Sequence, residues 1–130
     1  MSALGRILLV EDEALIQMLA AEYLEGSGFT VHVAGSASEA MNTLGIVPGG
    51  VDAVVVDMGL PDRRGDALIR EMRALHPSLP VVLATGADSK ELRSLFKGEE
   101  RIAFVTKPYT ERELLMALSS LGLRLTKAKP

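Results

Sequence analysis

Hydrophobic residues gather in five short runs along the chain, and a polar stretch with helical spacing follows each run. The runs cover residues 6–10, 29–34, 53–57, 80–85 and 102–106. The first, third and fourth are nearly continuous in aliphatic residues, which is typical of parallel strands covered on both faces. The second alternates between apolar and polar residues and predicts a half-exposed edge strand.

The stretches between these runs predict five helices. We expect them over residues 13–26, from Ser36, over 66–76, from Asp88 and from Thr110. Each of the starts Ser36, Asp88 and Thr110 has a glutamate three residues later, which is the spacing of a capping box. The residues expected to face the core are Leu15, Ile16, Leu19, Ala20, Tyr23, Leu24, Ala40, Met41, Leu44, Leu68, Ile69, Met72, Leu75, Leu92, Leu95, Phe96, Leu114, Leu115, Leu118 and Leu121.

Strict alternation of strands and helices predicts an α/β fold. With right-handed crossovers, the five strands form a parallel sheet that is doubly wound with five helices. The flavodoxin-like strand order 2-1-3-4-5 is the natural choice for five strands. We expect one domain over residues 1–121 and a C-terminal tail over 122–130, with no internal repeat or linker.

Composition narrows the class of protein further. With 48% hydrophobic and only 4% aromatic residues in 130, the core of this single domain must be mainly aliphatic. The absence of cysteine excludes disulfides and cysteine-based metal sites, and it suits a cytoplasmic location. No signal peptide is visible, and no apolar run approaches the roughly 20 residues needed to cross a bilayer. The net charge of −3 argues against direct nucleic-acid or anionic-membrane binding.

Candidate chemistry lies at the ends of the predicted strands. In the order 2-1-3-4-5, the carboxyl ends of strands 1, 3, 4 and 5 lie side by side, in the place where ligands bind to open α/β sheets. Glu11 and Asp12, Asp57, Thr85 and Lys107 follow these four strands. Carboxylates held together repel one another unless a cation compensates their charge, and oxygen ligands beside phosphate favour Mg²⁺.

Two uses of Asp57 remain open at this point. In the first, Asp57 and Asp12 bind Mg²⁺ directly, the carbonyl of Gly59 adds a ligand, and Glu11 acts through water. In the second, Asp57 is a nucleophile that forms an aspartyl-phosphate. Lys107 would then neutralise a phosphoryl oxygen, and Thr85 would donate its hydroxyl to another.

The same residues resemble the receiver domains of two-component response regulators, which have the chemotaxis-regulator-like fold. The motifs that match are Glu11-Asp12, Asp57 in Val-Val-Val-Asp-Met-Gly-Leu-Pro-Asp, Thr85 after Val-Val-Leu-Ala, and Lys107-Pro108. They lie in the expected order on the five-unit frame, and the resemblance covers residues 6 to about 121.

The resemblance implies phosphorylation of Asp57 by a histidine kinase or a phosphotransfer protein. It implies Mg²⁺ at Glu11, Asp12, Asp57 and the Gly59 carbonyl, and phosphoryl oxygens held by Thr85 and Lys107. It also implies a cis bond before Pro108, which is plausible because cis bonds occur mainly before proline. Such a protein is a signalling switch that catalyses its own phosphorylation and dephosphorylation, and it is not a turnover enzyme.

The resemblance also places a switch residue three positions before the lysine, at Phe104. When Thr85 moves toward the phosphoryl group, Phe104 would swing inward. The face built from helix 4, strand 5 and helix 5 would then change its affinity for a downstream protein. Many receivers have tyrosine or another aromatic residue at this position. Phenylalanine has no hydroxyl, so the switch residue of this chain cannot signal through a hydrogen bond. Because no effector domain follows residue 121, we expect a stand-alone receiver or an excised one.

Other classes of protein fit the sequence less well. A dinucleotide-binding fold needs a glycine-rich turn after the first strand, where this chain has Glu11-Asp12-Glu13. A haloacid-dehalogenase-type phosphatase needs an acid two residues after the nucleophile, where Gly59 stands. The remaining alternative is a pseudo-receiver, a protein-binding module that keeps the fold without phosphorylation. His32 and His76 have no ligand-like spacing and are expected to be structural or exposed.

Overall fold

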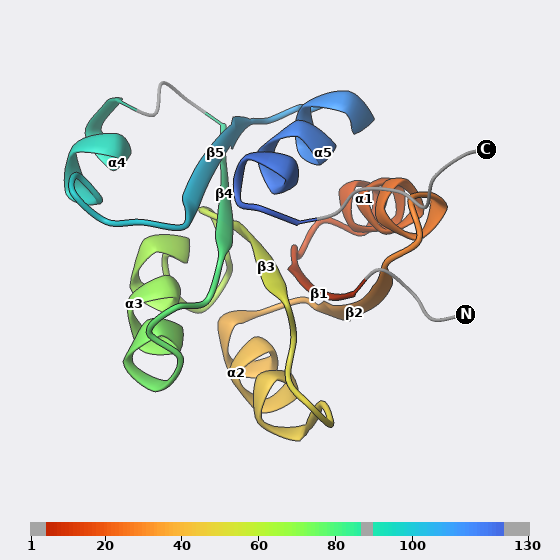
Figure 1. The fold of residues 1–130 in the computed structure, drawn as a ribbon, viewed down its shortest axis with the longest axis horizontal. Coiled ribbons are helices and arrows are strands. Elements are labelled where there is room, and N and C mark those ends of the chain that lie inside the picture. Colours follow the sequence, from red (N-terminus) through yellow and green to blue (C-terminus); the bar gives the residue numbers. More distant parts are fainter. Residues whose placement is uncertain (1–4, 87–89, 124–130) are drawn as a thin grey trace.

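The computed structural model describes residues 5–86 and 90–123, and within them five strands alternate with five helices. The strands form one parallel sheet in the order β2-β1-β3-β4-β5, which confirms the predicted fold (Figure 1). The strands are β1 (Arg6–Val10), β2 (Thr30–Ala34), β3 (Ala53–Asp57), β4 (Val81–Thr85) and β5 (Ile102–Thr106). The helices are α1 (Ala14–Gly26), α2 (Ala37–Ile46), α3 (Gly65–Leu75), α4 (Lys90–Leu95) and α5 (Glu111–Ser120).

Burial along the strands follows the hydrophobic pattern of the sequence. Strands β3 and β4 are buried at every position and β1 at all but its first, because helices cover both faces of the central sheet. Strand β2 lies at the edge and exposes Thr30 and Val33, as its alternation predicted. Strand β5 forms the other edge and is only partly buried.

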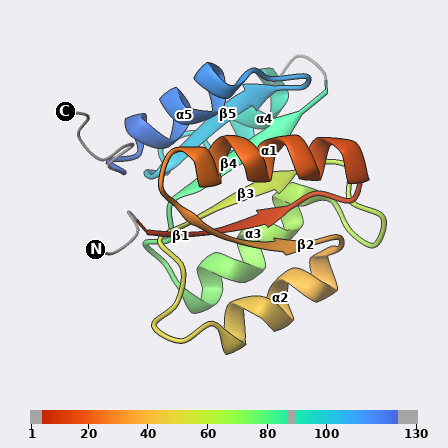
Figure 2. The ribbon, with the colours of Figure 1, turned by 90° about the vertical axis from the view of Figure 1, so that its right-hand side faces the viewer.

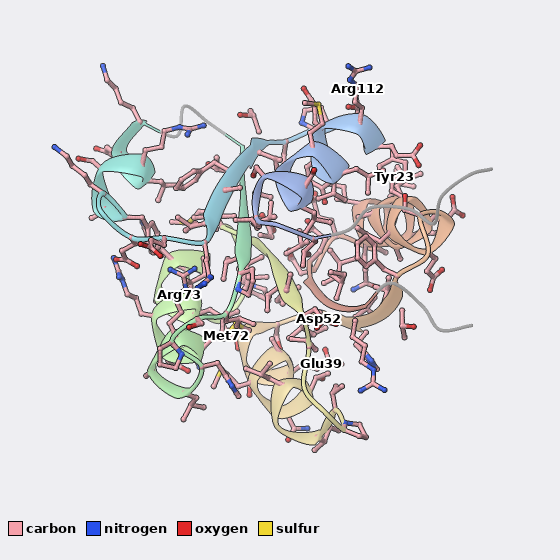
Figure 3. All side chains as sticks on the ribbon, in the orientation of Figure 1. Tyr23, Glu39, Asp52, Met72, Arg73 and Arg112 are labelled. Carbon is pink, nitrogen blue, oxygen red and sulfur yellow. The ribbon has the colours of Figure 1, made fainter. Side chains whose placement is uncertain are left out.

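Two aliphatic cores lie on opposite faces of the sheet. Helices α2, α3 and α4 cover one face, and α1 and α5 cover the other (Figure 1). Figure 3 shows this division through two labelled side chains, Met72 on α3 and Tyr23 on α1. Met72 is fully buried in the first core, and Tyr23 packs against the second.

The parallel strands bring distant parts of the sequence to one edge of the sheet. Their arrowheads all point the same way, so the turns that follow them meet at that edge (Figure 2). The register pairs Val10 with Val56, Asp57 with Ala84, and Thr85 with Thr106. The residues that end β1, β3, β4 and β5 therefore lie in one row, as the sequence predicted.

The predicted core faces of the helices were partly wrong. Leu15 and Leu19 of α1, Leu75 of α3 and Leu95 of α4 are exposed, whereas Ala20, Leu24, Met72 and Phe96 are buried. A helix lying on a flat sheet buries only one stripe of its surface, and these apolar residues lie beside that stripe. Together with Met18, the two leucines leave α1 with an exposed apolar strip.

The caps of α2 and α5 differ in an informative way. Thr110 and Glu113 form the predicted capping box at α5. At α2, Ser36 accepts the Glu39 N–H at 3.1 Å, but the Glu39 carboxylate accepts from Gly35 and not from Ser36. The predicted cap at Asp88 lies outside the described residues, as does the tail beyond residue 123.

The cap of α2 also includes a residue from the turn after β3. The carboxylate of Asp62 accepts the N–H groups of Ala37 at 2.8 Å and Ser38 at 2.9 Å. These two hydrogen bonds lower the pKa of Asp62 below its ordinary value. They tie the turn that begins at Asp57 to the start of a neighbouring helix.

Candidate functional site

Asp57 ends β3 with its side chain almost completely buried. Its Oδ1 atom accepts hydrogen bonds from Lys107 Nζ at 3.1 Å and from the Gly59 N–H at 3.3 Å. The chain folds back beneath it, where the Gly65 N–H donates to the Met58 carbonyl at 2.9 Å. A Cβ on Gly65 would stand 2.5 Å from the Asp57 carbonyl oxygen, so glycine is required for this close return.

Glu11 and Asp12 bring two more carboxylates to Asp57 from the end of β1. One oxygen of each of these three residues lies within 4.8 Å of the others. Burial raises the pKa of Glu11, and the charge of Asp57 adds to that rise. This set of clustered, partly desolvated oxygens is the donor chemistry that Mg²⁺ prefers, so the residues present fit the predicted metal.

Lys107 follows β5 and places one ammonium group among the acids. Nζ lies 3.1 Å from Asp57 Oδ1, 3.4 Å from Glu11 Oε1 and 3.3 Å from Glu13 Oε1. Burial alone would lower the pKa of Lys107, but the hydrogen bond to Asp57 and the charges of Glu11 and Asp57 raise it above its ordinary value. Lys107 therefore stays protonated throughout the neutral range.

The main chain around Lys107 is fixed on both sides. Its N–H donates to the Thr85 carbonyl at 2.8 Å, which ties it to the end of β4. The Lys107–Pro108 peptide bond is cis, as the sequence resemblance implied. Lys107 thus enters the site from a defined position beside β4.

Thr85 and Gly59 occupy the positions that the sequence assigned to them. Thr85 is the buried last residue of β4, one position beyond the Ala84 that pairs with Asp57. Gly59 lines an open pocket together with Asp12, Glu13, Asp57, Gly86 and Lys107. The hydroxyl role of Thr85 and the carbonyl role of Gly59 stay predictions.

Glu13 belongs to the site although it was not among the predicted site residues. Its carboxylate contacts Lys107, and its N–H donates to Glu11 Oε2 at 3.0 Å. The run Glu11-Asp12-Glu13 held this information, because the third acid of the run lies at the same edge of the sheet. The sequence did not show which of the three side chains would turn toward Lys107.

Phe104, the predicted switch residue, lies half-buried on β5 between the sheet and α4. Its ring centroid is 6.3 Å from that of Phe96, and the Arg93 guanidinium carbon lies 4.7 Å from its centroid. Phe104 pairs with Leu83, two residues before Thr85 on β4. A movement at the end of β4 therefore has a short path to α4, while the switching role itself stays a prediction.

A doubly wound five-stranded sheet with these residues at its carboxyl edge is typical of receiver domains. The family model of the response regulator receiver domain matches residues 7–119, and the chain belongs to this family. Its general role is therefore that of a receiver in two-component signalling.

Individual relatives agree with this assignment. The virulence transcriptional regulatory protein PhoP of Salmonella typhimurium is 34% identical over 92% of this chain, and the sensor kinase CckA of Brucella abortus is 30% identical over 93%. The non-phosphorylated HemR receiver domain of Leptospira biflexa is 31% identical, with a TM-score of 0.75 over 96% of this chain and 98% of its own. A response regulator receiver domain protein of Clostridium thermocellum has a TM-score of 0.82 at 26% identity, over 90% and 93% of the two chains.

The curated relatives are longer proteins. This chain spans 52% of the length of PhoP and 13% of CckA, so it corresponds to one part of each. In the described part of the chain, no helix combines the length and the apolar character needed to span a bilayer.

Proposed function

We propose that Asp57 accepts a phosphoryl group from a histidine kinase or a phosphotransfer protein, in a Mg²⁺-dependent reaction that switches partner binding. The observation that carries this proposal is the convergence of one cation and three carboxylates at the end of the sheet. Lys107 and the acids that follow β1 come from strands on opposite sides of β3 and meet at the same buried aspartate. A pseudo-receiver that is not phosphorylated does not require a cation and three carboxylates around one aspartate.

The chemistry requires positioning and charge neutralisation more than covalent assistance. A carboxylate oxygen of Asp57 bonds to phosphorus, while the P–N bond of the donor phosphohistidine breaks and the imidazole leaves with its electron pair. Lys107 neutralises one phosphoryl oxygen, and the Thr85 hydroxyl donates to another. Glu11, Asp12, Asp57 and the Gly59 carbonyl would hold Mg²⁺, which when bound offsets the charge of the acids and of the incoming group.

The output follows from a change in packing around Phe104, with Pro108 fixing the chain beyond the lysine. A groove lies along β5 between α4 and α5, and Arg93, Phe104, Glu113 and Met116 are among its lining residues. We assign the downstream protein partner to this α4–β5–α5 face. Phosphorylation changes the population of two packings of this face, so the protein acts as a switch and not as a turnover enzyme.

The proposal also covers the bounds of the domain, the partners that it does not bind and its location in the cell. We take residues 1–121 as the receiver domain and 122–130 as its tail. The net charge of −3 argues against direct binding to nucleic acid or to an anionic membrane. A cytoplasmic location fits a protein without cysteine that draws its phosphoryl group from a kinase.

Phosphorylation is tested by incubating the protein with Mg²⁺ and a small phosphodonor such as acetyl phosphate. We expect the intact mass to rise by one phosphoryl group, and beryllofluoride to shift amide NMR signals near Asp57, Thr85 and Phe104. Asp57→Asn is the matched control because it keeps the shape of the side chain and removes the nucleophile. No adduct on the wild type, or an equal adduct on Asp57→Asn, would refute the function.

A further inference from the structure

The ammonium group of Lys107 donates hydrogen bonds to Asp57 and Glu13 and forms an ion pair with Glu11. An ammonium has three N–H donors. Three carboxylates stand within 3.4 Å of Nζ, those of Asp57, Glu13 and Glu11. In the function proposed above, Lys107 must also reach a phosphoryl oxygen on Asp57, so the ammonium group has to move and its present contacts have to rearrange.

The three acids differ greatly in what losing Lys107 would cost them. The side chains of Glu11 and Asp57 are 2% and 6% exposed, whereas that of Glu13 is 60% exposed. A buried carboxylate without its cation keeps the full cost of desolvation. An exposed carboxylate is rehydrated when its partner leaves, so its ion pair is weak. Glu13 is therefore the contact that is cheapest to break.

The other hydrogen bonds of Glu11, Asp57 and Glu13 also indicate that Glu13 is the acid that releases Lys107 most easily. Glu11 also accepts the Glu13 N–H at 3.0 Å, and Asp57 also accepts the Gly59 N–H at 3.3 Å. Among the described residues, Lys107 is the only hydrogen-bond donor to the Glu13 carboxylate. Its release thus disturbs no second bond.

The main chain holds Glu13 at the mouth of the pocket. Glu13 immediately precedes α1, and its carbonyl accepts the Gln17 N–H at 2.9 Å in the first turn of that helix. Gln17 also donates from its side chain to the Glu11 carbonyl at 2.9 Å. With its backbone fixed in this way, the Glu13 side chain can leave Lys107 while its Cα stays in place.

We propose that Glu13 is a positioning residue that holds Lys107 in the resting state and is displaced by the phosphoryl group. The inference rests on the proposed function, since it describes how the same site exchanges its ligands. Lys107 passes from Glu13 to the phosphoryl oxygen, and Glu13 turns to water. Glu13 therefore opposes phosphorylation by the strength of one partly exposed ion pair.

Two variants separate this contact from a simple effect of charge. Glu13→Ala removes both the contact and the negative charge. Glu13→Asp keeps the charge but is one methylene shorter, so it cannot hold Lys107 from the same backbone position. If contact with Lys107 is what matters, both variants bind beryllofluoride more tightly than the wild type in saturating Mg²⁺. The expected gain is about two- to fivefold, the range of an exposed ion pair.

The control is Glu22→Asp in α1, whose side chain is exposed and is not among the ion-pair partners of Lys107. A double-mutant cycle with Lys107→Ala gives the second readout, because Glu13→Asp should have no further effect once the lysine is gone. A merely structural role of Glu13 would lower thermal stability without changing this ratio of affinities.

Each other outcome overturns the inference in a recognisable way. An affinity of Glu13→Asp equal to that of the wild type leaves only a charge effect or none. Weaker binding by Glu13→Asp means that Glu13 orients Lys107 for the anion and is not displaced by it. If the wild type itself does not bind beryllofluoride, the proposed function fails together with this inference.

Discussion

The two ends of the sheet carry clusters of charged side chains that are built in opposite ways. At the amino end, Arg73 of α3 is 12% exposed and donates to the carbonyls of Leu79, at 2.9 and 3.2 Å, and Arg101, at 2.6 Å. It also lies 3.3 Å from Glu99 Oε1, and its position on α3 is labelled in Figure 3. Each of the three guanidinium nitrogens of this partly buried cation donates to an oxygen of the protein itself.

At the carboxyl end, the charges do not balance. Four acids gather there, and in the described part of the chain only Lys107 brings a positive charge into contact with them. The pKa of Glu11 is raised by its burial and by its acidic neighbour. A charged cluster in which donors and acceptors are matched stabilises the fold. A cluster with surplus charge of one sign is a candidate site for a ligand of the opposite charge.

The largest expected effect comes from removing an acid at the carboxyl end. Asp12→Ala should lower Mg²⁺ affinity about 100-fold or more, because even indirect supports of a metal ligand contribute 10–100-fold. Stability without metal should stay equal or rise, since one like charge leaves the cluster. Isothermal titration calorimetry measures the affinity, and unchanged binding would remove the metal assignment. Asp66→Ala, which removes a partly buried acid paired with Arg64 outside this cluster, is the control.

The reverse result is expected at the amino end. Arg73→Ala should lower the free energy of unfolding by about 2 to 4 kcal/mol, because two carbonyls and Glu99 lose a partly buried charged donor. Denaturant titration measures this loss, and Mg²⁺ affinity should not change. Arg112→Ala is the control, since its exposed side chain points away from α5 into solvent (Figure 3). A loss of Mg²⁺ affinity in Arg73→Ala would contradict the division between the two ends.

A smaller effect should come from Tyr109, which lies buried next to the acidic end. Burial, and after it the charge of Glu11, raises the pKa of Tyr109 from 10.0 to about 12. Because the folded-state pKa lies above the unfolded-state value, the protonated form stabilises the fold fully below pH 10. This stabilisation, about 2 kcal/mol, is lost as the pH rises toward 12.

Ultraviolet titration of tyrosinate, with Tyr109→Phe to assign the signal, measures this pKa. Glu11→Gln should lower it, because the substitution removes the largest of the charges that disfavour the tyrosinate. A pKa of Tyr109 that does not respond to Glu11→Gln would indicate that burial alone raises it. The pKa of the buried Tyr109 thus reports the negative charge at the carboxyl end of the sheet.

Helix α1 shows where inference from the sequence reached its limit. Its apolar residues occur on more than one stripe, and helical spacing cannot rank two adjacent stripes. The sheet buried Ala20 and Leu24 and left Leu15 and Leu19 outside. Gly65 shows the same limit for the turn after β3. Its need for glycine arises from the Asp57 carbonyl, which only the folded chain brings close.

The sequence by itself determined the order of elements, the strands and the row of polar residues at their carboxyl ends. These follow from short-range patterns, because a buried parallel strand must be apolar and must end where polar residues begin. Only the tertiary structure decided that Lys107 is shared by Asp57, Glu11 and Glu13. Side-chain direction and burial depend on packing among segments distant in sequence, so the exposed Glu13 contact could emerge only once the chain had folded.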